Sequence, residues 1–357
     1  MKKIILTGGG SAGHVTPNIA LSKILLANDW NIEYIGSNDG IEKKLIEEVG
    51  IPYHGISSGK LRRYFSLENF KDPFKVIKGV GEAINLIKKI KPDIVFSKGG
   101  FVTVPVIIAA AFNKVPVVIH ESDYTPGLAN KISIPFAKKV CVSFPETLTH
   151  IPKDKAVYTG APIRKEITEG NREKGLKFCG FNNDKPILLL IGGSLGSQIL
   201  NKNLREIVTK LIKEFQIIHI CGKGLKDNNL DNIEGYKQFE YVNNELSDIF
   251  ACADIFVSRA GSNTIFEFLA LKKPNLLIPL SKKASRGDQI LNARSFEKSG
   301  FSKIIYEEDL DSELLYNFIH SLYKEKQKYI DKMSSFLLRD SAMEIYNIIE
   351  TNRLKNE

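Results

Sequence analysis

One order of elements recurs along the chain: a short apolar strand, a loop rich in small and polar residues, and a helix. The copies begin at Lys3–Thr7, Pro186–Ile191 and Ile255–Ser258. Apolar runs of this length are typical of buried strands, and their alternation with helices predicts a parallel sheet with helices on both faces. We therefore expect an α/β fold.

The chain is longer than one hydrophobic core of ordinary size requires, at 357 residues. Because the strand–loop–helix order starts again beyond Gly160–Arg164, we expect two doubly wound, Rossmann-like domains that face a cleft. The expected domains are residues 1–162 and 163–340. A final helix, residues 341–357, is expected to pack back on the first domain.

Apolar periodicity, glycine and proline place the other element boundaries. The helix after the first loop is expected to run from Pro17 to about Asn28, and the tail from about Asp311 to Glu350 is expected to be helical. Tyr241-Val242 and Asn275–Leu280 are expected to be strands.

The composition is typical of a soluble globular protein, with 43% hydrophobic and 25% charged residues. The most apolar stretch, Val102–Phe112, is far shorter than the ~20 residues that a membrane span needs. Met1–Thr7 reaches glycine too soon for a signal peptide and reads as a first strand. The four cysteines lack metal or redox spacing, so we expect free thiols in a reducing compartment and no bound metal.

A basic and apolar segment runs from Lys60 to Lys91, with nine Lys or Arg residues against three acidic ones. Such a segment can lie on an anionic bilayer, although an ordinary amphipathic helix with a solvated basic face has the same pattern. No recognised DNA or RNA motif accompanies the charge, so we do not expect nucleic acid as a partner. The candidate membrane-contact residues are Leu61, Phe65, Phe70, Lys71, Phe74, Lys75, Ile77 and Lys78.

The first glycine loop, Gly8–Gly13, matches G-x-G-x-x-G between a strand and a helix, which suggests a dinucleotide. The acid expected about 20 residues later is missing, because Glu33 lies inside the second strand and that strand ends at Gly36-Ser37. A glycine loop without this acid can still bind a diphosphate through backbone N–H groups. His14 follows the loop and is either a structural histidine or a general base for an attacking hydroxyl.

The strand Ile255–Ser258 is followed by a helix that Ser262 or Asn263 can cap. A helix N-terminus at the carboxyl end of a strand favours a phosphate, and Glu267, one turn later, could reach a pair of sugar hydroxyls. An ordinary strand–loop–helix unit has the same pattern. The second glycine loop, Gly192–Ser197, offers Ser194 to another phosphate.

Three further residues have polar groups suited to this chemistry. Arg164, at the expected hinge, could neutralise a diphosphate, or it is a surface arginine. Asp288 and Gln289 suit sugar hydroxyls, although by themselves they mark only a helix N-terminus.

Taken together, the motifs resemble the MurG family of bacterial cell-wall glycosyltransferases over essentially the whole chain. They are Gly9–Pro17, Lys98–Pro105, His120–Lys131, Gly160–Arg164, Gly192–Ser197, Ser258–Glu267 and Asp288–Ala293. Members of this family transfer N-acetylglucosamine (GlcNAc) from UDP-GlcNAc to the muramoyl-pentapeptide on undecaprenyl diphosphate (lipid I), forming lipid II. The resemblance implies the two-domain B-type glycosyltransferase fold and inverting transfer that needs neither metal nor cofactor.

The resemblance also implies a donor site in the C-terminal domain, with Glu267 on the ribose, Val242 against the uracil and Gln289 on the GlcNAc. The residues implied for UDP-GlcNAc are Ser11, Ala12, Gly13, Asp123, Asn130, Arg164, Ser194, Val242, Ser262, Asn263, Thr264, Glu267 and Gln289. Asp123 departs from the family pattern, in which many members have Asn. His14 is the candidate base, and Asp288 is the next candidate.

Lipid I is embedded in an anionic membrane, so the resemblance favours membrane contact by the basic segment and a peripheral place on the cytoplasmic side. Two alternatives stay open. A nicotinamide-dependent oxidoreductase would follow from the first glycine loop and would bind NAD(H). A sugar-nucleotide epimerase, or a non-catalytic binding protein of the same fold, would need no lipid acceptor.

Overall fold

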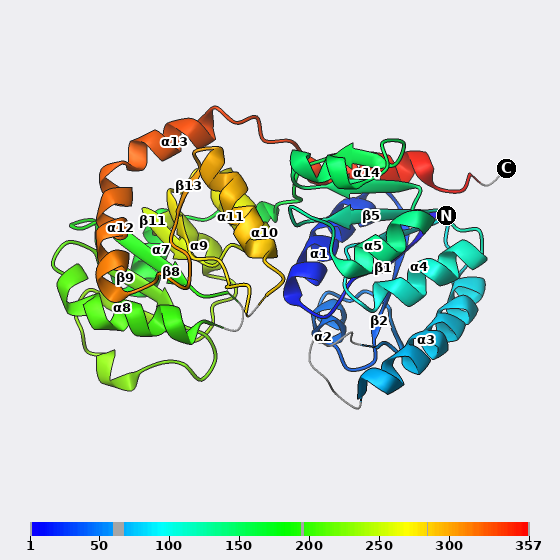
Figure 1. Cartoon of the computed structure of the whole chain (residues 1–357), viewed down its shortest axis with the longest axis horizontal. Coiled ribbons are helices and arrows are strands. Elements are labelled where there is room, and N and C mark those ends of the chain that lie inside the picture. Colours follow the sequence, from blue (N-terminus) through cyan, green and yellow to red (C-terminus); the bar gives the residue numbers. More distant parts are fainter. Residues whose placement is uncertain (1, 60–67, 194–195, 284, 356–357) are drawn as a thin grey trace. The chain divides into compact units, whose positions relative to one another are not determined.

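Parallel strands form both sheets of the structure, a computed structural model that describes residues 2–59, 68–193, 196–283 and 285–355. For residues 68–71 and 73 it describes the backbone alone. The chain divides into two units, each with its own sheet and core (Figure 1). Unit 1 is Met1–Ile163 with Arg339–Glu357, and unit 2 is Arg164–Leu338.

The sheet of unit 1 has seven strands within the described residues, in the spatial order β3-β2-β1-β4-β5-β6-β7. They are β1 (Lys2–Thr7), β2 (Trp30–Ser37), β3 (Tyr53–Ile56), β4 (Ile94–Ser97), β5 (Val117–Glu121), β6 (Lys139–Val142) and β7 (Ala156–Tyr158). The chain winds outward from β1 to β3 and then in the opposite direction from β4 to β7. In such sheets, ligands bind outside the carboxyl ends of the two strands where the order reverses, here β1 and β4.

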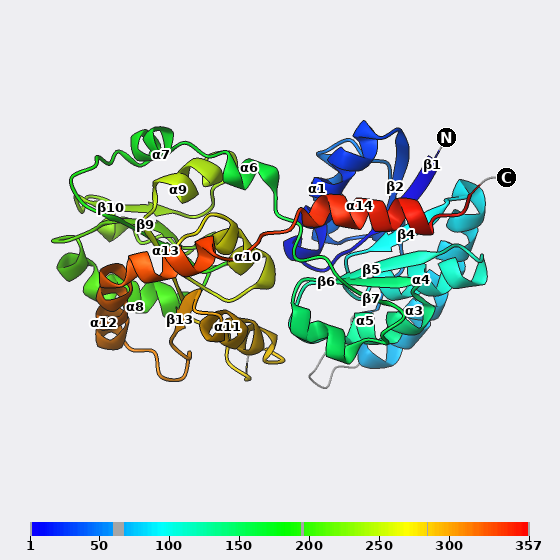
Figure 2. The same cartoon turned by 90° about the horizontal axis from the view of Figure 1, so that it is seen from above.

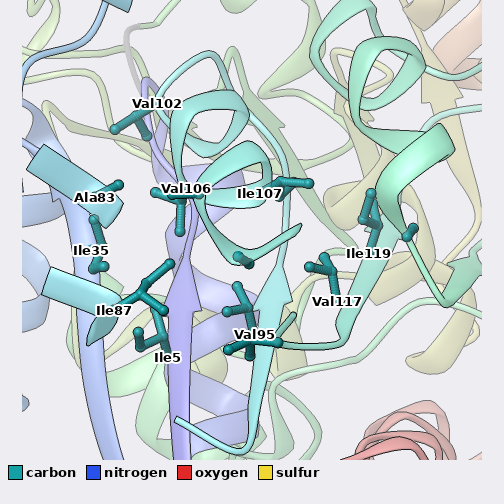
Figure 3. Close-up of a cluster of buried hydrophobic side chains, with 14 of the residues drawn as sticks. Ile5, Ile35, Ala83, Ile87, Val95, Val102, Val106, Ile107, Val117 and Ile119 are labelled. Carbon is teal, nitrogen blue, oxygen red and sulfur yellow. The ribbon is translucent and has the colours of Figure 1, made fainter. Parts of the chain in front are cut away.

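Alternate side chains of these strands enter two different cores, because successive residues of a strand point to opposite faces. Ile5, Val95 and Val117 lie on the face covered by α3 (Glu68–Ile90) and α4 (Thr103–Phe112), as Figure 3 shows. Ile4 and Phe96 lie on the other face. The helices there are α1 (Ala12–Ala27), α2 (Ile41–Glu47) and α14 (Ser341–Asn352). The remaining helices of unit 1 are α5 (Leu128–Ser133), η1 (Ile134–Phe136) and η2 (Pro145–His150).

The last helix, α14, belongs to unit 1 although unit 2 precedes it in the chain. Ile345 and Ile349 are buried in the same cluster as Ile4, and α14 lies beside α1 in Figure 2. Lys2 forms an ion pair with Glu350 at 3.2 Å. These contacts join the two ends of the chain in one core.

Unit 2 repeats the same winding with six strands among its described residues, in the order β10-β9-β8-β11-β12-β13. They are β8 (Ile187–Ile191), β9 (Gln216–Ile220), β10 (Tyr236–Phe239), β11 (Ile255–Ser258), β12 (Asn275–Leu277) and β13 (Ser302–Ile304). The order reverses between β8 and β11. One core face contains Phe250, Phe256 and Phe268, and the last two rings meet edge to face at 4.6 Å.

Two helices of unit 2 precede its first strand, and the others follow strands or one another. They are α6 (Lys165–Thr168), α7 (Arg172–Cys179), α8 (Gln198–Leu211), η3 (Asn228–Leu230), α9 (Leu246–Cys252), α10 (Ser262–Ala270), α11 (Asp288–Lys298), α12 (Ser312–Lys324) and α13 (Lys326–Ser334). The expected helical tail is thus three helices, α12, α13 and α14.

Three other expected boundaries are wrong. The first helix was expected to begin at Pro17, but α1 begins at Ala12 and contains Pro17 in its interior. Proline therefore did not mark the first helical position. Tyr241-Val242 is not a strand, and the strand of that region is β10, which ends at Phe239. Strand β12 ends at Leu277 because Pro279, which has no N–H group, cannot extend the ladder.

Two sequence expectations concern features of the whole chain. All four cysteines are buried and free. Among the helices that the structure describes, none has both the length and the apolar character needed to cross a membrane.

Candidate functional site

The first glycine loop and the segment after β4 meet at the reversal point of unit 1. Gly9 N donates to Gly99 O at 3.2 Å, and Lys98 N donates to Thr7 O at 2.9 Å. A Cβ atom at Gly100, where φ is +95°, would lie 2.2 Å from the carbonyl oxygen of Gly9. Glycine is therefore required where these two backbones cross.

His14 lies in the first turn of α1, with Nδ1 2.9 Å from Gly9 O and 3.2 Å from Ser11 Oγ. A carbonyl oxygen only accepts hydrogen bonds, so Nδ1 carries the hydrogen and the lone pair of the neutral ring lies on Nε2. This tautomer lets Nε2 accept a proton. Ser11 and Gly13 are exposed beside it.

Two amides of the first loop already have partners inside unit 1. Gly9 N bonds Gly99 O, and Gly10 N donates to the carboxylate of Glu42 at 3.1 Å. The interpretation of this loop as a diphosphate cradle is therefore wrong for these two amides. The start of α1, Ser11–Gly13, is the part of the motif that stays exposed or half-buried.

A second polar cluster lies after β5 and surrounds the buried carboxylate of Glu121. Its oxygens accept hydrogen bonds from Asp123 N at 2.9 Å, Gly127 N at 2.9 Å and Asn130 Nδ2 at 2.7 Å. Burial raises the pKa of Glu121. The structure thus brings Asp123 and Asn130 together around a residue that the sequence analysis had not selected.

Lys98, at the end of β4, is also fully buried, and its ammonium group donates to Ser122 Oγ. Burial lowers the pKa of Lys98 to about 8, against the opposing effect of the Glu121 and Asp123 charges. A lysine and a carboxylate that are both buried at strand ends form a rigid support for the segment 121–130.

In unit 2, Arg164 forms an ion pair with Glu267 of α10, with Nε 2.8 Å from Oε1. Glu267 is buried and Arg164 is half-buried. The N-cap of α10 is Gly261, which has no side chain to bond the first N–H groups of the helix. Ser262, Asn263 and Thr264 form this first turn, where the helix dipole offers positive charge, and Arg164 contacts the same helix through Glu267.

Residues at the start of α11 are tied to the same strand ends. Gln289 Oε1 accepts hydrogen bonds from Ala260 N at 3.3 Å and Leu280 N at 3.1 Å, so its Nε2 group is the part that could reach a ligand. Asp288 forms an ion pair with Arg286 at 3.2 Å. The Val242 side chain is buried in the core of unit 2, and Ser194 lies outside the described residues.

Arg259 was missed by the sequence analysis although it directly follows β11. Its guanidinium group donates to Ile278 O at 3.1 Å and Ser197 Oγ at 2.8 Å, and it pairs with Glu307. Burial lowers the pKa of Arg259, while Glu307 acts in the opposite direction. One side chain thus joins the segments that follow β8, β11, β12 and β13. The only signal in the sequence was a charged residue at the end of an apolar strand.

Sequence models of one protein family match both units. The N-terminal domain of glycosyltransferase family 28 matches residues 4–142, and its C-terminal domain matches residues 187–351. The chain belongs to glycosyltransferase family 28. Its two reversal points therefore lie in the two halves that define the family.

A curated relative from Clostridium tetani is 60% identical over 349 residues, which is 98% of both chains. It is named UDP-N-acetylglucosamine--N-acetylmuramyl-(pentapeptide) pyrophosphoryl-undecaprenol N-acetylglucosamine transferase. The crystal structure of MurG from Acinetobacter baumannii is similar with a TM-score of 0.77 at 24% identity, covering 98% of this chain and 100% of that one. The UDP-GlcNAc 2-epimerase of Methanocaldococcus jannaschii gives 0.65 at 16%, with 98% and 100% covered. Both structural likenesses concern the fold, which is the B-type glycosyltransferase fold.

The described residues of this family 28 chain contain no group of three or more His, Cys, Asp or Glu side chains arranged to hold a metal ion. The sequence does contain one D-x-D segment, Asp309-Leu310-Asp311. Asp311 is the N-cap of α12 and accepts a hydrogen bond from Leu314 N at 2.7 Å. Its carboxylate therefore has a structural partner.

The buried Lys98 predicts a pH-dependent stability. Its folded-state pKa of about 8 lies below the ordinary 10.5, so between these values the unfolded chain holds a proton that the folded chain lacks. Folding therefore gains stability as the pH rises through this window. We expect the unfolding free energy of the wild type to increase relative to Lys98→Met as urea unfolding is repeated from about pH 8 to 10. A difference that stays constant with pH would contradict the lowered pKa of Lys98.

Proposed function

We propose that this chain transfers GlcNAc from UDP-GlcNAc to lipid I, the undecaprenyl-diphosphate-linked MurNAc-pentapeptide, and so forms lipid II in peptidoglycan synthesis. The observation that carries the proposal is 60% identity over 98% of the chain to a relative named for this transfer. The family membership excludes the nicotinamide-dependent oxidoreductase that the first glycine loop had suggested.

The proposed reaction is one inverting displacement. A hydroxyl of the acceptor's muramoyl sugar attacks C1 of GlcNAc, its proton passes to a base, and the C1–O bond to UDP breaks. The transition state resembles an oxocarbenium ion, and negative charge grows on the departing diphosphate. A base near the acceptor and fixed positive charge near the diphosphate are therefore the groups that the enzyme has to supply. No step of this scheme uses a metal.

For the donor, we assign the diphosphate to the first turn of α10 and to Arg164. The Arg164–Glu267 contact uses Nε and Oε1, so the terminal guanidinium nitrogens can address the diphosphate while Oε2 addresses the ribose. Gln289 would hold the GlcNAc through Nε2. Val242 is buried, so its contact with the uracil would use the backbone. The other proposed donor contacts are Ser11, Ala12, Gly13, Asp123, Asn130, Ser194, Ser262, Asn263 and Thr264.

For the base, we assign His14, because the bond from Nδ1 to Gly9 O leaves the lone pair on Nε2. Asp288 remains the second candidate, although its carboxylate pairs with Arg286. The acceptor would bind unit 1, and the donor would bind mainly unit 2.

Helix α3 is the part of unit 1 that we assign to the cytoplasmic face of an anionic membrane. Phe74 is 74% exposed and Ile77 is 69% exposed, one helical turn apart. Lys75 and Lys78 lie in the same turn, and each also pairs with an acidic side chain of α3. Leu61 and Phe65 lie outside the described residues, and so do the side chains of Phe70 and Lys71.

The direct test of the function is transfer of radiolabelled GlcNAc from UDP-GlcNAc to a lipid I analogue in the presence of EDTA. Label in the lipid product is the expected result, and it also tests the metal-free mechanism. Consumption of UDP-GlcNAc without an acceptor would favour the epimerase, whose structural likeness to this chain keeps it as the second candidate. No transfer from folded protein that binds UDP would contradict the proposal.

Glu267→Ala is expected to raise KM for UDP-GlcNAc by roughly 10- to 100-fold, because a charged hydrogen bond to the ribose is lost in the ground state. Steady-state kinetics at saturating acceptor measures this effect. Glu169→Ala is the matched control, since Glu169 forms an exposed ion pair with Lys165 in the same unit. An unchanged KM would remove Glu267 from the donor site.

His14→Ala is expected to lower kcat by about 10²–10⁴-fold, with little change in KM, because proton removal would lose its base. The exposed His150→Ala in unit 1 is the control. A loss smaller than about tenfold would mean that His14 is not the base, and Asp288 would be tested next.

Phe74→Ser combined with Ile77→Ser is expected to weaken binding to anionic vesicles by roughly tenfold or more, because two exposed apolar side chains would no longer enter the bilayer. Vesicle sedimentation measures the binding, and kcat on a soluble acceptor analogue should be unchanged. Leu337→Ser, which alters an 86% exposed leucine of unit 2, is the control. Equal binding of all three proteins would exclude α3 as the membrane contact.

A further inference from the structure

Glu42, a residue of α2, has a fully buried carboxylate beside the first glycine loop, with an exposed fraction of 0%. Oε1 accepts hydrogen bonds from Ser37 N at 3.1 Å and from Ser37 Oγ. Oε2 accepts from Gly10 N at 3.1 Å. Three donors therefore compensate a charge that would otherwise be costly to bury.

Three glycines make room for this carboxylate. A Cβ atom would lie 2.5 Å from Oε1 at Gly9 and 2.2 Å from the carboxylate at Gly40. At Gly36 it would lie 2.9 Å from Glu42 Cγ and 2.3 Å from the Tyr53 hydroxyl. None of the three has a positive φ, so their backbone conformation does not explain them. Their common feature is close approach to Glu42. The backbone is thus shaped around the Glu42 side chain, and at Gly36 also around Tyr53.

Glu42 and His14 bond to the two ends of one peptide group. The N–H of Gly10 donates to Glu42 Oε2 at 3.1 Å, and the C=O of Gly9 accepts from His14 Nδ1 at 2.9 Å. These N–H and C=O groups belong to the planar Gly9–Gly10 amide. A carboxylate, an amide and an imidazole therefore form one continuous chain of hydrogen bonds.

Hydrogen bonds in such a chain polarise one another. An amide whose N–H donates to a carboxylate has a more negative carbonyl oxygen, which is a better acceptor for Nδ1–H. In a Ser-His-Asp triad, the aspartate fixes the tautomer of the histidine and stabilises its protonated form by direct contact. In this chain, the peptide can transmit both effects from Glu42 to His14.

Two tyrosines support the arrangement from the neighbouring strands. Tyr34 on β2 donates to Gly8 O at 2.7 Å, and Tyr53 on β3 donates to Ser37 O at 2.6 Å. Burial raises the pKa of both hydroxyls, and the nearby Glu42 charge adds to the shift, so both stay protonated at neutral pH. They hold the carbonyl group of Gly8, at the start of the glycine loop, and that of Ser37, whose N–H bonds Glu42.

We propose that Glu42 is a positioning residue for the transfer reaction. Acting through the Gly9–Gly10 amide, it holds His14 in the tautomer whose Nε2 accepts the proton of the attacking hydroxyl. The catalytic part of this inference, proton acceptance by Nε2, rests on the proposed function. The effect of Glu42 on the His14 tautomer does not, because it can be measured in the free enzyme.

The test compares full-length wild type with Glu42→Gln, which keeps the shape of the side chain and removes its charge. The ¹⁵N shifts of the His14 ring report the tautomer, and steady-state kinetics with a lipid I analogue separates kcat from KM. In the wild type, the neutral ring should carry its proton on Nδ1. In Glu42→Gln, the share of this tautomer should fall and kcat should drop by roughly 10- to 100-fold, with KM for UDP-GlcNAc nearly unchanged.

Glu33→Gln is the matched control. Glu33 lies on β2 in the same unit and forms an ion pair with His54 at 2.7 Å, which does not involve the glycine loop. In the Glu33→Gln protein, the His14 tautomer and kcat should equal those of the wild type. A folded Glu42→Gln protein with the wild-type tautomer would overturn the proposal, whether or not kcat falls.

The wild type alone provides a test that does not depend on folding of the variant. A neutral His14 ring protonated mainly on Nε2 would overturn the proposal. Failure of the proposed function is a separate result: the wild type would then transfer no GlcNAc, while the ring shifts of wild type and Glu42→Gln would still test the link.

Discussion

The reversal of winding between two adjacent parallel strands organises both units. At this point the connections from the two strands leave in opposite directions, so their loops and helix N-termini remain beside the carboxyl ends. In unit 1, β1 and β4 lead to the first glycine loop and to Lys98. In unit 2, β8 and β11 lead to the second glycine loop and to Arg259 and α10. His14 and the first turn of α10, which we assign to catalysis and to the diphosphate, follow strands of these reversal points.

Buried charges hold the loops at these points in one conformation. Glu42 bonds the first glycine loop, Glu121 bonds the segment that carries Asp123 and Asn130, and Arg259 joins the strand ends of unit 2. Each buried charge has several hydrogen-bond partners, which offset the cost of removing it from water. The first glycine loop shows the consequence: the N–H of Gly10 binds a carboxylate of the same chain, and the C=O of Gly9 binds the His14 ring.

The strand–loop–helix order was readable from the sequence, and with it the α/β class and both glycine loops. The buried strands and the presence of a helix after β11 depend on local apolar patterns, which a sequence displays directly. The expected cap at Ser262 or Asn263 was wrong, because the N-cap of this helix is Gly261. Glu42 was not predicted, because dinucleotide-binding folds have their acidic residue at the end of β2. In this chain the acidic residue beside the glycine loop lies in α2, five residues after Ser37. Glu121 and Arg259 were missed because their roles depend on partners distant in sequence.

The central claim is that the sugar nucleotide binds the amino end of α10 beside the Arg164–Glu267 pair. The most direct measurement is a crystal structure of the full chain with bound UDP. We expect the diphosphate at the first turn of α10, within hydrogen-bond distance of Arg164, and the ribose hydroxyls on Glu267. A nucleotide bound at the Gly8–Gly13 loop of unit 1, with no density at α10, would contradict it.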